Sequence, residues 1–290
     1  MPTRKKLFLV IVAIFVGFLL LDLMTPAAFE FQTPFIPVLM MNLVVAQLTL
    51  VCVWGALVEG TFWIRLPWTI LMLVISWAGL AYGVYLVHGT ANPAEVLALG
   101  LIWFYAFMIS YIPLKLAAWG FGWRILKVGQ KDSSKPKNNY QIRDIMIGTA
   151  ILAVTLSIGR MVVPGDLPSW EEVLSKSGLS DYGAFISLFV FSVVSLIVKL
   201  PCIWIALAVP LSSILRYSTS WIAIAAVLGL FEMGVLIFFL GISGTGPEMW
   251  DLAAGLMVGH AVMAASMIGV LYLLRTFGYR MSRRKRLAAD

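Results

Sequence analysis

The sequence contains few charged residues, few cysteines and few histidines for its length. Charged side chains account for 12% of the 290 residues, and the chain holds two cysteines and two histidines. A typical soluble domain is about one quarter charged, so this chain cannot cover a water-facing surface. Both cysteines, Cys52 and Cys202, lie inside apolar runs, which disfavours a disulfide framework or a cysteine-based metal site. These deficits exclude an ordinary soluble enzyme, a disordered chain and a disulfide-rich secreted domain.

Long apolar runs take the place of the missing charge, because hydrophobic residues make up 61% of the chain. Eight segments come close to the length of about 20 residues that crosses a bilayer as a helix. They are 7–24, 36–58, 68–87, 95–118, 144–163, 183–210, 219–242 and 250–274. In lipid the backbone must satisfy its own hydrogen bonds, so each segment should be helical. The sequence predicts an all-α polytopic membrane protein with eight transmembrane helices, the sixth kinked or ended early by Pro201 and Pro210.

The first segment also has features of a cleaved signal peptide. It has a basic start, an apolar stretch and the small residues Ala27 and Ala28 after it. The apolar stretch is long for a signal peptide, and its removal would spoil the repeat described below. We therefore expect it to be a retained span.

Basic residues gather beside alternate ends of these segments. The other set of loops holds Arg160 and Lys176 against six acidic residues. Cytoplasmic loops are enriched in Lys and Arg, so the pattern predicts that both termini are cytoplasmic. The basic tail Arg283, Arg284, Lys285 and Arg286 follows the last span, where anionic lipid headgroups are a more economical partner than nucleic acid.

The two halves share the order and spacing of their span ends. Phe-Gly-Trp-Arg at 121–124 follows the fourth segment, and Phe-Gly-Tyr-Arg at 277–280 follows the eighth. In each half a Gly-Thr pair, at 89–90 and 244–245, precedes this motif, and the intervals from threonine to phenylalanine are 31 and 32 residues. The pattern predicts a tandem 4+4 repeat. Repeats with an even number of spans insert the same way up, related by a pseudo-two-fold axis along the membrane normal.

This repeat divides the chain into a first four-helix unit (1–119), a basic cytoplasmic linker (120–142) and a second four-helix unit (143–290). The second unit carries an insert at 165–181 on its outer side and the basic C-terminal tail. Ser169 with Glu172 three residues later matches a capping box, which predicts a short amphipathic helix on the outer surface. A plain polar loop is the alternative.

The entry to the fifth segment carries a resemblance. Tyr140, Ile142, Arg143, Asp144 and Thr149 match the pattern aromatic-x-Ile-Arg-Asp-Leu-Leu-x-x-Thr, with Ile-Met in place of Leu-Leu. This entry resembles that of a large group of planctomycete-type bacterial inner-membrane proteins, and the Phe-Gly-aromatic-Arg endings are similar to theirs. The resemblance implies a bacterial inner-membrane location and a multi-pass topology, and it implies no catalytic activity.

Three ionisable residues lie inside predicted spans, where each costs about 2.5–3.5 kcal/mol on insertion scales. They are Lys199, Glu232 and His260. Glu232 and His260 each lie ten residues from the outer end of their span, about 15 Å deep and near the midplane. We expect Ser192, Ser195, Asn42 and Gln47 to support them as polar neighbours. Asp22, by contrast, is placed near the outer end of its span, where it can reach the interface.

The cluster has two interpretations. As a proton or ion site, Glu232 would accept the proton, Lys199 would be its charge partner and His260 a relay. As a structural feature, Lys199 and Glu232 would set helix register and His260 would be a packing residue. The sequence favours the structural interpretation.

Three function classes follow. The first is a non-catalytic multi-pass scaffold or assembly subunit with an unidentified protein partner. The second is a proton- or ion-coupled transporter or channel-like protein. The third is an intramembrane enzyme, since Gly-Ile-Ser-Gly at 241–244 matches the nucleophile tetrad of rhomboid-type proteases, although Ser243 and His260 differ in depth. The chain lacks a nucleotide-binding loop and a metal-ligand spacing, so we expect no cofactor, no metal and no catalysis.

Overall fold

A computed structural model describes most of the chain. The described residues are 4–58, 62–90, 92–127, 146, 149–150, 153–158, 161, 169–177, 182–240 and 247–283. Within them the chain forms eight named helices and two short strands. The helices are α1 (Arg4–Ala28), α2 (Phe35–Leu57), α3 (Phe62–His88), α4 (Pro93–Gly120), α6 (Trp170–Ser177), α7 (Tyr182–Ala208), α8 (Leu211–Leu240) and α9 (Pro247–Thr276).

Six of the described helices are long and apolar enough to cross a membrane. They are α1, α2, α3, α4, α8 and α9, and α7 contributes a shorter apolar stretch, Val193–Ala208. Lipid is the solvent that suits such helices, because their exposed faces are rich in large apolar side chains. The chain is therefore a multi-pass integral membrane protein with a helical fold.

Two helices begin earlier than the apolar runs predict. We expected segments from 68 and from 219, but α3 begins at Phe62 and α8 at Leu211. Pro67 lies inside α3, and the polar start of α8 around Arg216 is helical and exposed. Hydropathy detects the part of a helix that lies in lipid, whereas backbone hydrogen bonding continues into the polar boundary. The predicted early end of the sixth segment is confirmed, because α7 ends at Ala208, before Pro210.

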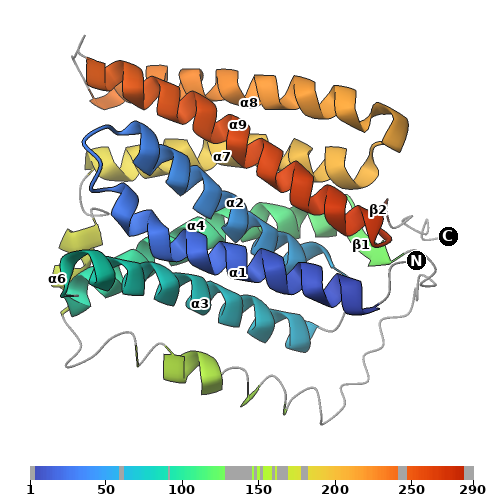
Figure 1. Ribbon diagram of the computed structural model, residues 1–290, viewed down its shortest axis with the longest axis horizontal. Coiled ribbons are helices and arrows are strands. Elements are labelled where there is room, and N and C mark those ends of the chain that lie inside the picture. The colour runs from blue at the N-terminus through green and yellow to red at the C-terminus, as the bar shows by residue number, and fades with distance from the viewer. Residues whose placement is uncertain are drawn as a thin grey trace.

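Helix α2 lies at the centre of the bundle. It packs against α1, α3 and α4 on one side and against α9 on the other, and α9 in turn packs on α7 and α8 (Figure 1). The core forms where α2, α4, α7 and α9 meet. Its fully buried side chains include Leu48, Cys52, Val198, Met263 and Met267.

Glycines allow the closest helix contacts. A Cβ atom at Gly229 of α8 would lie 2.5 Å from the carbonyl oxygen of Leu256 in α9, and one at Gly83 of α3 would lie 2.6 Å from the carbonyl oxygen of Leu23 in α1. Close backbone approach of this kind is how small residues join helices in lipid, where burial of apolar surface supplies little drive.

The two ends of the bundle differ in charge. The start of α1, the end of α4 and both strands lie at one end, and α6 lies at the other (Figure 1). Arg65 near the start of α3 and Arg275 in the last turn of α9 belong to the first end. Glu95 in the first turn of α4 and the acidic first turn of α6 belong to the second.

The all-α prediction missed a small sheet. β1 (Trp123–Lys127) and β2 (Tyr279–Arg283) pair antiparallel, with Ile125 opposite Met281. Each strand follows a glycine with positive φ, 66° at Gly122 and 92° at Gly278, a conformation that suits glycine and turns the chain out of the preceding helix. The Phe-Gly-aromatic-Arg motifs are thus helix ends that lead into strands. Residues 123–127 are accordingly not part of a plain linker.

Several predictions from the sequence fall outside the described residues. They concern most of the fifth span (144–163), most of the linker (120–142), the tetrad 241–244 and Arg284, Lys285 and Arg286. Arg283 is described as the last residue of β2. The insert helix is confirmed as α6, and the backbone N–H of Glu172 donates to Ser169 Oγ at 3.3 Å, as the capping box predicts.

Candidate functional site

The structure brings Glu232 and His260 together. They lie on α8 and α9, each within about one turn of the close approach of Gly229 to Leu256. Glu232 Oε2 is 3.1 Å from His260 Nε2, and the two side chains are 1% and 0% exposed. Phe191 of α7 lies edge-on to the imidazole, with ring centroids 6.0 Å apart. We call these two residues the acid–imidazole pair.

The hydrogen bonding of His260 restricts the protonation of this pair. His260 Nδ1 lies 3.0 Å from the carbonyl oxygen of Leu256, and a carbonyl oxygen only accepts, so Nδ1 carries a proton. A neutral imidazole then presents only a lone pair at Nε2, which faces Glu232 Oε2. Neither Nε2 nor Oε2 has a hydrogen bond among the described residues, although the two atoms lie 3.1 Å apart. A proton on either residue would supply the missing donor, so the contact can hold one proton.

Lys199 is not the partner of Glu232. Its Nζ donates to Ser110 Oγ of α4 at 3.0 Å, and no ion pair joins it to Glu232 in the described part of the chain. Lys199 is buried where α7 meets α4, close to the thiol of Cys52 on α2. Lys199 therefore does not join Glu232 and His260, and the predicted cluster of three residues is wrong in this respect. Depth was read from the sequence, but the direction in which α7 presents Lys199 depends on helix rotation.

The supporting polar residues divide between two places. Asn42 of α2 lies at the α2–α9 contact, where a Cβ atom at Gly259 would be 2.5 Å from its Nδ2, and its amide donates to the carbonyl of Val38 at 3.0 Å. Ser195 is buried on α7, and its Oγ has no hydrogen-bond partner among the described residues. The side chain of Ser192 lies outside the described atoms. Gln47 belongs to another cluster.

This cluster, which we call the Asp22 cluster, consists of Asp22, Gln47 and Ser76. Gln47 Nε2 donates to Asp22 Oδ2 at 2.8 Å and to Ser76 Oγ at 3.1 Å, so it joins α1, α2 and α3. Asp22 is 1% exposed, and the expectation that it reaches the interface is wrong. A Cβ atom at Gly79 would lie 3.0 Å from Asp22, which shows that a glycine on α3 makes room for the carboxyl group. Ionisable side chains are thus buried in both halves of the chain.

Two arginines hold the ends of α2 and α7. The guanidinium of Arg65 donates to the carbonyl oxygens of Gly55 and Val58, and that of Arg275 donates to those of Ala206 and Val209. These carbonyls are at helix C-termini, where backbone acceptors lack a partner within the helix. Arg65 and Arg275 were read from the sequence as markers of orientation, but they also tie neighbouring helices together.

The described residues contain no group of three or more His, Cys, Asp or Glu side chains able to hold a metal ion. Searches against protein-family models, curated proteins and solved structures find no match to the chain. The chemistry of the site must therefore be argued from its own geometry.

Proposed function

We propose that the protein is a non-catalytic multi-pass scaffold or assembly subunit of the bacterial inner membrane. The observation that carries this proposal is that its buried polar side chains connect neighbouring helices. Gln47 connects α1, α2 and α3, Lys199 connects α7 to α4, and the acid–imidazole pair connects α8 to α9. Polar contacts between apolar helices stabilise a bundle in lipid, because a polar group that loses its contact there finds no water to replace it.

An eight-span topology with both termini cytoplasmic is part of this proposal. Lys127 ends β1 at one end of the bundle, and Trp170 begins α6 at the other (Figure 1). The chain between them has to pass from one side of the membrane to the other, and 144–163 is the apolar run of suitable length. The basic residues at the end that carries β1 and β2 favour that end as cytoplasmic. The resemblance of 140–149 to planctomycete-type proteins supports the inner membrane.

A tandem repeat also belongs to the proposal. Ile125 and Met281 each lie four residues after the phenylalanine of their motif, and they are opposite each other in the sheet. Two equivalent strands that pair antiparallel about equivalent residues obey a two-fold axis. A second repeated motif supports it: Cys-Val-Trp-Gly-Ala-Leu at 52–57 and Cys-Ile-Trp-Ile-Ala-Leu at 202–207 are 150 positions apart. In both copies the cysteine, alanine and leucine are buried and the tryptophan is exposed.

The scaffold function is tested by purification of the tagged protein from membranes in a mild detergent. We expect a defined protein partner in constant ratio to the tagged chain, and we expect the E232L/H260M double variant to keep it, because the pair is structural. Recovery of the chain alone, under conditions that leave it folded, would contradict a scaffold.

The topology is tested by cysteine labelling in intact cells with a membrane-impermeant maleimide. Ser175 on α6 is exposed, and Ser282 lies in β2 at the opposite end. We expect S175C to react in intact cells and S282C to react after the membrane is permeabilised. The reverse pattern would overturn the orientation, and equal reactivity in intact cells would overturn the separation of the two ends.

A proton-coupled transporter is the second candidate, and one observation favours it. The contact between His260 Nε2 and Glu232 Oε2 can hold a single proton inside the bundle, with Phe191 edge-on to the ring. The protein in liposomes that contain a pH-sensitive dye should then conduct protons or couple a solute to them, and E232Q should abolish the flux. Absence of flux from the wild-type protein would leave the scaffold as the function.

A further inference from the structure

The outer ends of α3 and α4 enclose an apolar cleft that is separate from the buried polar clusters. Its volume is about 240 Å³. Val84 of α3 and Leu99 and Ile102 of α4 are the partly exposed residues of its walls, and Glu95 and Lys176 form its rim. The buried Ala81, Val96 and Ala98 lie beneath them. α4 packs mainly on α2 and meets α3 through a small cluster of Ala81, Val96 and Trp77. The small side chains of Ala81 and Ala98 leave the space open.

Trp77 joins α3 to α4 beside the cleft. Its indole Nε1 donates to the carbonyl oxygen of Val96 at 3.0 Å, and a Cβ atom at Gly100 would lie 3.1 Å from the same nitrogen. The residues that line the cleft come from α3, α4 and α6, so the cleft is separate from the acid–imidazole pair on α8 and α9. In a bilayer an empty apolar groove loses dispersion contacts on one side, so an acyl chain is the natural material to fill it.

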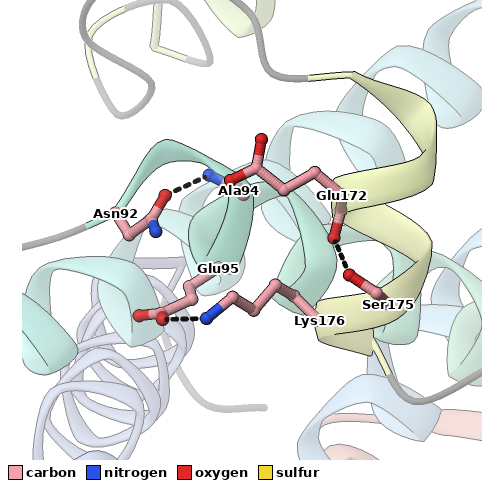
Figure 2. A network of polar contacts seen from close by, with 6 residues as sticks. All are labelled: Asn92, Ala94, Glu95, Glu172, Ser175 and Lys176. Atoms are coloured by element: carbon pink, nitrogen blue, oxygen red, sulfur yellow. Dashed lines mark hydrogen bonds and ion pairs between the residues drawn. The ribbon is translucent and has the colours of Figure 1, made fainter.

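The rim carries one charge of each sign. Glu95 Oε1 lies 3.1 Å from Lys176 Nζ, and the two side chains are 50% and 45% exposed, so both remain accessible. Figure 2 shows Glu95 on α4 and Lys176 on α6 pointing toward each other. Asn92 caps α4 through the N–H of Ala94, and Ser175 Oγ donates to the carbonyl oxygen of Glu172 within α6 (Figure 2). These bonds lie within α4 and α6, the two helices that carry Glu95 and Lys176.

The cleft lies at the depth of a lipid headgroup and the first part of its chain. Glu95 is in the first turn of α4, and Ile102 is seven residues further, about 10 Å along the helix. Tyr82 and Tyr85 are exposed on the same part of α3 and stack with their centroids 6.0 Å apart. Exposed tyrosines of this kind mark the headgroup level of a membrane. Glu95 and Lys176 thus lie at the level of the headgroups, and the apolar walls of the cleft lie deeper in the bilayer.

We propose that this cleft binds one zwitterionic phospholipid with a primary-amine headgroup, of the phosphatidylethanolamine class. The lipid ammonium donates to Glu95, the phosphate accepts from Lys176, and one acyl chain lies along Leu99 and Ile102. A rim with no net charge matches a headgroup with no net charge. An anionic headgroup that pairs with Lys176 would take the cation that neutralises Glu95 and supply none in return, and a quaternary ammonium has no N–H to donate. The inference needs membrane insertion, and it holds for a scaffold and for a transporter alike.

Native mass spectrometry tests this with the full-length protein in detergent and an equimolar mixture of phosphatidylethanolamine, phosphatidylglycerol and phosphatidylcholine. We expect one phosphatidylethanolamine to remain bound in preference to the other two. I102W, which fills the cleft, should reduce its retention about tenfold or more, and K176Q should do so by loss of a charge-assisted hydrogen bond. V227W is the matched control, because Val227 is exposed on α8, away from the cleft, and it should keep the lipid.

Each outcome bears on the proposal. Equal retention of the three lipids by the wild-type protein would overturn the headgroup assignment. Undiminished retention in I102W would overturn the cleft as the site of the acyl chain, and undiminished retention in K176Q would overturn the role of the rim. Should I102W fail to give a monodisperse protein, K176Q changes an exposed residue and still decides the question.

Discussion

His260 Nε2 lies 3.1 Å from Glu232 Oε2, while the other ring nitrogen of His260 faces the carbonyl oxygen of Leu256. This arrangement lets one proton be shared between two buried groups from adjacent helices. Loss of either side chain leaves a buried polar atom of the other without its neighbour.

Removal of one partner should therefore harm the protein more than removal of both. We expect E232A to lower the free energy of unfolding by about 1–3 kcal/mol, because it removes the group that faces the buried Nε2 of His260. The E232L/H260M double variant replaces both with apolar groups and should return close to wild type. Denaturant titration in detergent micelles measures both. A double variant no more stable than E232A would contradict a coupled pair.

The protonation of His260 can be observed directly by nitrogen NMR. The chain has two histidines, so H88Q leaves His260 as the single reporter. We expect Nδ1 to be protonated, since it donates to the Leu256 carbonyl. In E232Q the glutamine amide donates to Nε2, and the neutral Nδ1–H tautomer should be the sole form. A spectrum with the proton on Nε2 alone would refute the assigned hydrogen bonding.

Two glycines of α8 offer a matched test of the α8–α9 contact. A Cβ atom at Gly229 would lie 2.5 Å from the backbone oxygen of Leu256, whereas one at Gly234 meets no atom within 4 Å. We expect G229A to lower the free energy of unfolding by about 1–3 kcal/mol, because the helices must separate. G234A should raise it by about 0.5–1 kcal/mol through helix propensity. Equal effects of the two changes in the same micelle assay would contradict the close approach.

The register of β1 and β2 predicts where an engineered disulfide can form. Ile125 and Met281 are opposite in the antiparallel register, at a Cα separation that allows a disulfide, typically about 4.5–5.5 Å. In the I125C/M281C variant with a protease site inserted near Asp132, the two fragments should stay joined until a reductant is added. I125C/R280C is the control, because Arg280 points to the other face of the sheet. Efficient cross-linking of the control, or none in the test variant, would contradict the register.

Much of the fold was predictable from the sequence. The apolar runs located the long helices, and the Ser169–Glu172 spacing located α6 and its cap. The equal depth of Glu232 and His260 also followed from counting residues, and the structure joins them. These features depend on residues close in sequence. The repeated Cys-x-Trp-x-Ala-Leu motif is also visible in the sequence, inside the second and sixth apolar segments.

Other features could not be read in this way. Asp22 was placed at the interface because it lies late in its span, yet it is buried against Gln47 and Ser76. Lys199 was assigned to Glu232, yet it donates to Ser110. The β1–β2 sheet joins residues more than 150 positions apart, and each strand alone is a five-residue mixture of apolar and basic residues after a helix.

The sequence by itself determined that the chain lies in lipid, where its long helices are, and which ionisable residues lie within apolar runs. The free energy of transfer of a helix from water to lipid is a sum of contributions from consecutive residues, so it follows from the sequence alone. Only the tertiary structure decided which buried group meets which, because that depends on how each helix is rotated about its axis. Rotation is set by packing against neighbours distant in the chain, such as Gly79 opposite Asp22 and Gly229 opposite Leu256.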